Sequence, residues 1–191
     1  ICGHYMYFSE FPERYSAEGD GFFYFWTSYS VENEEGDTES GYELWKTNGN
    51  PGQSIPIKSF TDSGCSEMIY FKGHVYFSSP ESIHGDELWR TDGSNSGTLM
   101  FKDIAYGKNS SSPRSFTIFN DELYFTATDN EYGNQLWKTD GTSLGTVRVT
   151  NLNYGASQEI SYLTALGDKL IFCIFSEYHD CLMHSTDGSI N

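Results

Sequence analysis

The sequence predicts an all-β protein of the β-propeller type, with about four blades that each contain four antiparallel strands. Aromatic residues make up 17% of the chain, with 14 Tyr and 14 Phe, and such residues favour strands. A seven-residue motif, ELWRTDG at 87–93, recurs at intervals of about 45 residues. A period of this length that holds four short strands is typical of a propeller blade.

The motif marks the third strand of each unit. It reads ELWKTNG at 43–49 and QLWKTDG at 135–141, and a degenerate copy ends in STDG at 185–188. Its leucines are Leu44, Leu88, Leu136 and Leu182. Three further apolar runs belong to a unit, and in the third unit the four runs are expected near 115–119, 122–127, 134–139 and 146–151. Each unit therefore has the strand content of one blade.

We expect one domain over residues 1–191, because a sheet with two apolar faces is buried only by stacking on its neighbours. The unit boundaries are placed at about 20–62, 63–108, 109–156 and 157–191. Within 1–19, the segment 3–10 (GHYMYFSE) resembles 73–79 and has two interpretations: it completes the fourth unit of its own chain, or it pairs with another chain. The last unit stops within the repeat, as expected for a piece of a longer protein.

Packing explains the motif without a ligand. Leu and Trp alternate along a strand, so they point to opposite faces and both should be buried. Asp-Gly should form a tight turn in which Gly takes positive φ and Asp bonds nearby amides. The residues expected to carry these structural roles are Leu44, Trp45, Leu88, Trp89, Asp92, Gly93, Leu136, Trp137, Asp140 and Gly141.

These residues resemble a known repeat named for its ELWxxDGT consensus, which is common in secreted bacterial proteins. The match covers Glu87–Gly93 with Gly97-Thr98, and Gln135–Thr142 with Gly145-Thr146. The outer units are degenerate, since Asn48 replaces Asp in the first and Met183 is read in place of Trp in the fourth. The resemblance implies an extracellular, propeller-like module, often within large adhesive or surface-anchored proteins, and it implies no catalytic residues.

The formal net charge of −16 limits the partners. A phosphate backbone would be repelled, so nucleic acid is not expected, and anionic membrane surfaces are disfavoured for the same reason. No apolar run reaches the length of a membrane span. Solubility or cation binding in an extracellular setting fits the acidity better.

Four cysteines and one sequon favour a secreted or surface protein. Cys173 and Cys181 flank a stretch expected to form a hairpin, which would bring them close enough to bridge and leave Cys2 and Cys65 as the second pair. Other connectivities and four free thiols are the alternatives. Asn109 begins an Asn-Ser-Ser sequon and is a candidate for glycosylation.

Two kinds of ligand are considered for the loops that join the second and third strands. Acidic residues there are candidate calcium ligands, with solvated loops as the alternative, and they are Glu34, Glu35, Asp37, Asp129 and Glu131. Aromatic residues at or beside the same loops are candidates for stacking on sugars, with burial in the core as the alternative, and they are Trp26, Tyr42, Tyr132 and Tyr178.

No catalytic residues are predicted. The stretch 141–145 matches G-x-S-x-G, but it lies in a turn between strands, whereas a nucleophile elbow needs a strand followed by a helix. The sequence therefore favours a non-enzymatic extracellular structural or adhesive module, with other protein chains as partners and calcium as the one cofactor considered. A glycan-binding propeller is the alternative.

Overall fold

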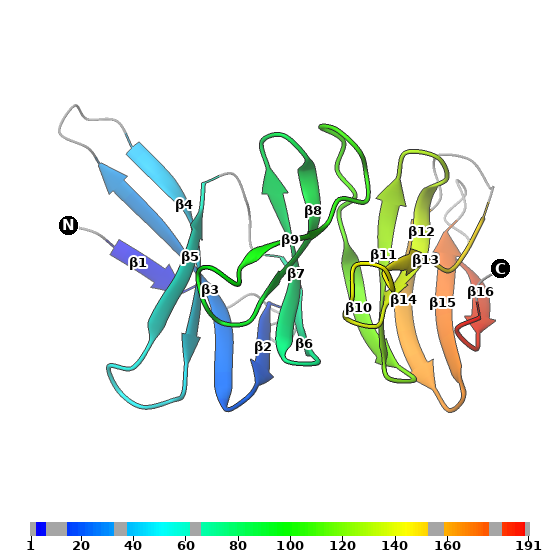
Figure 1. The fold of residues 1–191 in the computed structure, drawn as a ribbon, viewed down its shortest axis with the longest axis horizontal. Coiled ribbons are helices and arrows are strands. Elements are labelled where there is room, and N and C mark those ends of the chain that lie inside the picture. The colour runs from blue at the N-terminus through cyan, green and yellow to red at the C-terminus, as the bar shows by residue number, and fades with distance from the viewer. Residues whose placement is uncertain are drawn as a thin grey trace. The chain divides into compact units, whose positions relative to one another are not determined.

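A computed structural model describes residues 3–6, 15–32, 38–61, 66–152, 159–175 and 181–189, with the backbone alone at 3–6, 31–32 and 39. Its described residues form sixteen β-strands and no helix, in four antiparallel sheets (Figure 1). The predicted all-β, propeller-like fold is confirmed. Within the described part of the chain, no helix has the length and hydrophobicity needed to cross a bilayer.

The sheets follow the repeat units in order, and they hold five, four, four and three strands. The first contains β1 (Gly3–Met6), β2 (Ser16–Gly19), β3 (Phe22–Glu32), β4 (Thr38–Thr47) and β5 (Ile55–Phe60). The second contains β6 (Met68–Phe71), β7 (His74–Glu81), β8 (Gly85–Thr91) and β9 (Leu99–Lys102). The third contains β10 (Arg114–Phe119), β11 (Glu122–Asp129), β12 (Gly133–Thr139) and β13 (Val147–Arg148). The fourth contains β14 (Glu159–Leu166), β15 (Lys169–Phe175) and β16 (Cys181–Thr186).

The amino-terminal strand lies on the first sheet of its own chain. β1 pairs antiparallel with β3, from Gly3 opposite Ser30 to Met6 opposite Thr27. β2 pairs with the preceding half of β3, from Ser16 opposite Phe25. The two short strands thus share one edge of β3.

The chain forms two compact units, one of residues 1–80 and 89–99 and the other of residues 81–88 and 100–191. In the first compact unit, aromatic side chains form the core. The Trp26 ring makes T-shaped contacts with Phe60 and Phe77 at centroid distances of 5.5 and 5.4 Å, and Phe60 contacts Trp89 at 5.6 Å. These four side chains join the first and second sheets.

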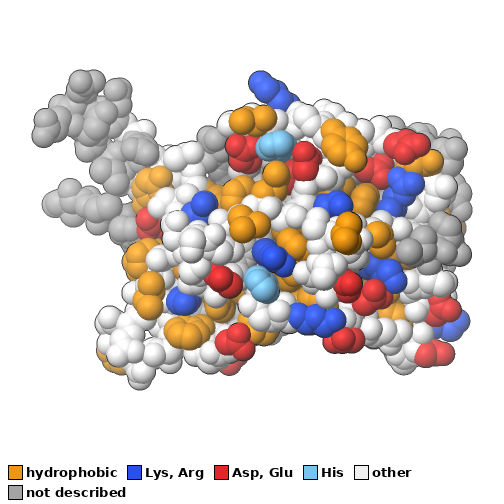
Figure 2. All heavy atoms as spheres, in the orientation of Figure 1, with side chains coloured by type: hydrophobic (Ala, Val, Ile, Leu, Met, Phe, Trp, Pro, Cys, Tyr) orange, Lys and Arg blue, Asp and Glu red, His pale blue; other side chains and the backbone are white. Residues whose placement is uncertain are grey.

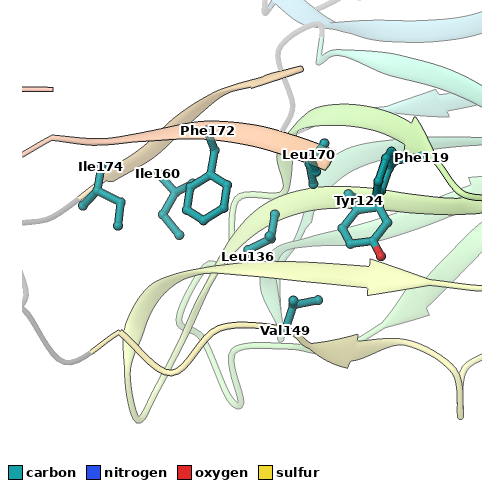
Figure 3. Packing of buried hydrophobic residues seen from close by; sticks show 8 residues of the cluster. All are labelled: Phe119, Tyr124, Leu136, Val149, Ile160, Leu170, Phe172 and Ile174. Carbon is teal, nitrogen blue, oxygen red and sulfur yellow. The ribbon is translucent and has the colours of Figure 1, made fainter. Parts of the chain in front are cut away.

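In the second compact unit, the third and fourth sheets pack through aliphatic and aromatic side chains (Figure 3). The cluster consists of Phe119, Tyr124, Leu136, Val149, Ile160, Leu170, Phe172 and Ile174, none more than 4% exposed. Tyr124 and Leu136 come from one face of the third sheet, while Leu170, Phe172 and Ile174 alternate along β15. The alternation of buried positions along β15 is what a strand with one face on a neighbouring sheet requires.

Candidate functional site

The repeated Asp-Gly turn is held by its own side chains. In the second repeat unit, Asp92 Oδ1 accepts hydrogen bonds from the backbone N–H and the hydroxyl of Ser94, at 2.8 and 2.6 Å. These bonds lower the pKa of Asp92. The Gly93 N–H donates to Thr91 Oγ1 at 2.9 Å, and Gly93 has a φ of 85°, which favours glycine. The carboxylate therefore stabilises the turn.

The same turn occurs in all four units. Asp140 Oδ1 accepts from Thr142 N–H at 2.8 Å, Asp187 Oδ1 from Ser189 N–H at 2.9 Å, and Asn48 Oδ1 from Asn50 N–H at 3.1 Å. In the second and third units the Gly-Thr pair closes the loop, because Thr98 and Thr146 each donate to the carbonyl four residues earlier. The turn is a structural element in each unit.

A contact between neighbouring blades uses the glycine of this turn. In the second compact unit, Lys138 Nζ donates to the Gly188 carbonyl and to Glu122 Oε2, both at 3.0 Å. The buried Tyr124 hydroxyl donates to the same Glu122 at 3.1 Å and lies where a methyl group on Gly188 would be. Burial and the Glu122 carboxylate raise the pKa of Tyr124. We call this arrangement of a tyrosine, a lysine and a turn glycine the interblade contact.

The interblade contact recurs between the first and second sheets. Lys46 and the Tyr24 hydroxyl surround the buried Gly93, so that a side chain there would press on both. Lys46 Nζ also lies 4.7 Å from the centroid of the Phe22 ring, at the position that Glu122 holds in the third unit. The cation–π contact thus replaces the ion pair. In contrast, a methyl group on Gly49 in the first unit would meet nothing within 4 Å.

The first residue of the motif has a role that the sequence did not indicate. Glu87 is fully buried and accepts hydrogen bonds from the N–H groups of Ile104 and Ala105 at 2.7 and 3.1 Å, and from the Ser111 hydroxyl at 2.6 Å. Burial raises the pKa of Glu87 despite these donors. The side chain fixes the segment that leaves β9.

Gln135 does the same in the third unit. Its Oε1 accepts from Leu152 N–H and the Thr150 hydroxyl, both at 2.9 Å, and its amide donates to the Leu152 and Tyr132 carbonyls. The signal in the sequence was the recurrence of Glu or Gln before each Leu-Trp pair.

The register of the fourth sheet corrects the alignment of its motif. Phe172 lies opposite His184, as Phe125 lies opposite Trp137 in the third sheet. The His184 ring stacks on Phe172 at 5.7 Å, so His184, and not Met183, takes the place of Trp. Met183 occupies the place of Leu and is 75% exposed. Anchoring the alignment on Leu182 misplaced it by one residue, because Met183 replaces the motif leucine and a different leucine directly precedes it.

The tryptophans of the other units are buried to different degrees. Leu44, Leu88 and Leu136 are fully buried and Trp89 is 8% exposed, whereas Trp45 and Trp137 are half-buried. The expectation that every motif tryptophan is buried is therefore too strong.

The three described residues that were considered for sugar stacking are buried or half-buried. Trp26 is 4% exposed in the core, and its indole N–H donates to the Ser66 carbonyl at 3.2 Å, so its ring is not accessible to a sugar. Tyr42 lies within β4, half-buried opposite Ser28. Tyr132 is half-buried beneath the Arg148 guanidinium, which lies 3.8 Å from its ring centroid. Tyr178 lies outside the described residues.

Asp129, considered for calcium, is already bonded within the fold. Its Oδ1 accepts from the N–H groups of Glu131 and Tyr132 at 3.0 and 2.6 Å, and its Oδ2 pairs with Arg148 at 2.6 Å. The described residues contain no group of three or more His, Cys, Asp or Glu placed to hold a metal ion. On the face in Figure 2, acidic and basic side chains are interspersed. Glu34, Glu35 and Asp37 lie outside the described residues, and calcium binding there stays a prediction.

Cys173 and Cys181 form a disulfide between β15 and β16, as the sequence predicts, with a Cα–Cα distance of 5.5 Å. It is consistent with an oxidising compartment. Cys2 and Cys65 lie outside the described residues. The two ends of the sequon differ in burial: Asn109 is exposed, whereas Ser111 is fully buried and its hydroxyl donates a hydrogen bond to Glu87.

Comparisons with known proteins support the fold only. No family model and no curated protein sequence matches the chain. One similar solved structure is the AtxE2 isopeptidase in its apo form, at 11% identity and a TM-score of 0.50, covering 85% of this chain and 25% of that chain. Another is the GH43 protein BlXynB, a mutant form from Bacillus licheniformis, at 10% identity and a TM-score of 0.37, covering 83% of this chain and 36% of that chain. The chain thus spans about a quarter of the isopeptidase.

Proposed function

We propose that this chain is a non-enzymatic extracellular structural or adhesive module that works by joining protein surfaces. The observation that carries the proposal is the use of the repeated motif. Its chemically capable groups are committed to the fold: Asp92 to the turn, Glu87 to the segment after β9, and Lys138 to the neighbouring blade. A motif whose polar groups hold the fold together is what we expect of a module whose function is structural.

Three further features support an extracellular location. The Cys173–Cys181 disulfide fits an oxidising environment. Asn109 is exposed, so a glycan there would not disturb the packing. The net charge of −16 favours solubility outside the cell.

Electron microscopy of native material, isolated without refolding or truncation, tests the structural role. We expect filaments, lattices or other ordered assemblies. Discrete single particles at every concentration would contradict the structural role and favour the second candidate.

The second candidate is a glycan-binding propeller, and one observation favours it. Tyr106, in the loop after β9, is 73% exposed, and Asn130 Nδ2 donates a hydrogen bond to its backbone carbonyl at 3.2 Å, which holds this part of the loop. A glycan array, with and without calcium, tests this function. Binding that is lost in Tyr106→Ala, but kept in the control Leu144→Ala, would support it, since Leu144 is 94% exposed on a different loop.

A further inference from the structure

The sequon lies in the segment between β9 and β10, and its residues differ in their surroundings in the folded protein. Asn109 and Ser110 are exposed, whereas Ser111 is fully buried. The Ser111 hydroxyl donates a hydrogen bond to Glu87 Oε2 at 2.6 Å. The folded protein therefore exposes the asparagine of the sequon but buries its hydroxyl.

Hydrogen bonds also hold the backbone of the sequon. The Ser111 N–H donates to the Asp86 carbonyl at 2.9 Å, and the Ser111 carbonyl accepts from the Thr128 N–H at 2.8 Å. Ser110 Oγ accepts from the Asp86 N–H at 3.0 Å. All these partners belong to the second compact unit, so the sequon is fixed by the folding of that unit.

Close packing fixes the chain at Asn109 and before it. A methyl group added to Gly85, the first residue of β8, would overlap the backbone carbonyl of Asn109. Three residues earlier in the chain, the Tyr106 carbonyl accepts a hydrogen bond from Asn130 Nδ2 at 3.2 Å. The segment is thus held on both sides of Asn109, and the sequon can leave its place only when several contacts break together.

A transferase that reads Asn-x-Ser must contact the hydroxyl of the third residue, because that hydroxyl distinguishes a sequon from other asparagines. In the folded protein this hydroxyl is bonded to Glu87 and is buried. We propose that Asn109 is an N-glycosylation site that is modified only before the second compact unit has folded. This inference is independent of the proposed structural function, because it depends on the burial of Ser111 and not on what the module joins.

The co-substrate of this modification is an oligosaccharide attached to a lipid diphosphate. In the transfer, Asn109 Nδ2 forms a bond to the anomeric carbon of the first sugar, and the bond from that carbon to the diphosphate breaks. The diphosphate leaves with the bonding electron pair, and the nitrogen loses one proton to a base of the transferase. Because Asn109 is exposed after folding, the attached glycan stays at the surface. The relative rates of transfer and folding therefore set the fraction of chains that carry the glycan.

An experiment with delayed addition of the transferase tests the order of the two events. The unglycosylated full chain, with its disulfide intact, is unfolded in urea and then diluted to refold. A purified oligosaccharyltransferase and its lipid-linked donor are added either at dilution or after tryptophan fluorescence shows that folding is complete. Mass spectrometry should find Asn109 modified after early addition. After late addition the rate should be at least about a hundredfold lower, because opening the segment breaks the bond to Glu87 and two backbone bonds.

A second sequon on the same chain provides the control. Gly52→Asn creates one whose third residue is Ser54, and residues 52–54 are all exposed. Gly52 has a φ of 75°, which asparagine tolerates, and an added methyl group there would meet nothing within 4 Å. This control sequon should be modified after early and late addition alike. Late modification of Asn109 as fast as that of the control would overturn the proposal, and so would a failure to modify Asn109 at either time.

A matched pair of glycine variants tests the protection directly. Gly85→Ala should make the folded chain a better acceptor at Asn109 by about tenfold, because the methyl group displaces the Asn109 carbonyl and releases the sequon. Gly133→Ala is the control: Gly133 begins β12 as Gly85 begins β8, has a φ of 72°, and has nothing within 4 Å of an added methyl group. Circular dichroism verifies that both variants fold. Equal transfer to the two folded variants would contradict the proposal, and if Gly85→Ala does not fold, the delayed addition to wild type decides it.

Discussion

Replacing Gly188 by Ala should reveal how much the interblade contact contributes to stability. Gly188 has a φ of 94°, and an added methyl group would overlap the hydroxyl of Tyr124, whose side chain is fully buried. The backbone cost of the left-handed conformation is about 1–2 kcal/mol. Displacing the turn also breaks the bond from Lys138 to the Gly188 carbonyl, and a hydrogen bond to a charged group contributes about 1.5–3 kcal/mol. The sum is about 2.5–5 kcal/mol.

Gly167→Ala is the matched control. Gly167 lies in the hairpin between β14 and β15 of the same sheet, has a φ of 61°, and has nothing within 4 Å of an added methyl group. It should therefore lose only the backbone term, about 1–2 kcal/mol. The free energies of unfolding are measured by urea denaturation, with the slope m checked for each variant.

Equal losses of stability in G188A and G167A would refute the reasoning. They would show that the turn moves at no cost and that the contact of Lys138 and Tyr124 with Gly188 adds nothing measurable. A loss in G188A that persists unchanged in a Lys138→Met background would point to the overlap with Tyr124, and not to the lysine bond, as the source of the effect.

Three further predictions concern stability, each measured by urea denaturation. Trp89→Ala should cost about 3–5 kcal/mol, because it empties the aromatic core beside Phe60; a loss under 1 kcal/mol would contradict that packing. Because the pKa of Glu87 is raised in the folded protein, the protonated side chain contributes to stability fully at a pH below the ordinary pKa of glutamate, and this contribution is lost as the pH rises through the pKa of the folded state. The free energy of unfolding of wild type should therefore fall relative to that of E87Q as the pH rises through this pKa, and parallel pH profiles of the two proteins would contradict the prediction. Reduction of the Cys173–Cys181 disulfide should cost about 2–3 kcal/mol, and no change in the Cys173→Ser/Cys181→Ser double variant would contradict it.

Much of the fold follows from the sequence because local signals agree with the global period. The alternation of buried positions, the Asp-Gly turns and the spacing of the motif all indicate four-stranded units, and the structure has a sheet for each. The Cys173–Cys181 disulfide was also predictable, because a hairpin between two strand-like runs leaves the two residues near each other.

Residues that act through tertiary contacts were not predictable in the same way. The role of Glu87 depends on the path of the chain after β9, since two of its partners are the backbone amides of Ile104 and Ala105. Trp26 was predicted to lie at or beside a loop, but its position on β3 points it into the core beside Phe77. The recurrence of Glu or Gln before each Leu-Trp pair marks the position of Glu87, but it does not reveal which groups the side chain contacts.

The interblade contact has two halves, the tyrosine and lysine of one unit and the turn glycine of the next unit. The outer units each keep the half that contacts a neighbouring sheet. The first unit keeps Tyr24 and Lys46, which contact Gly93, but its own turn carries Asn48 and the open Gly49.

The fourth unit shows the reverse pattern. It keeps Asp187 and Gly188, which receives Lys138, but it has Ile171 and Ser185 where the tyrosine and lysine would stand. Each outer unit thus retains the half of the motif that meets a neighbouring sheet among the described residues, and it departs from the motif in the other half. A motif used as a ligand-binding code would have no reason to vary in this order, whereas a motif that joins blade to blade would.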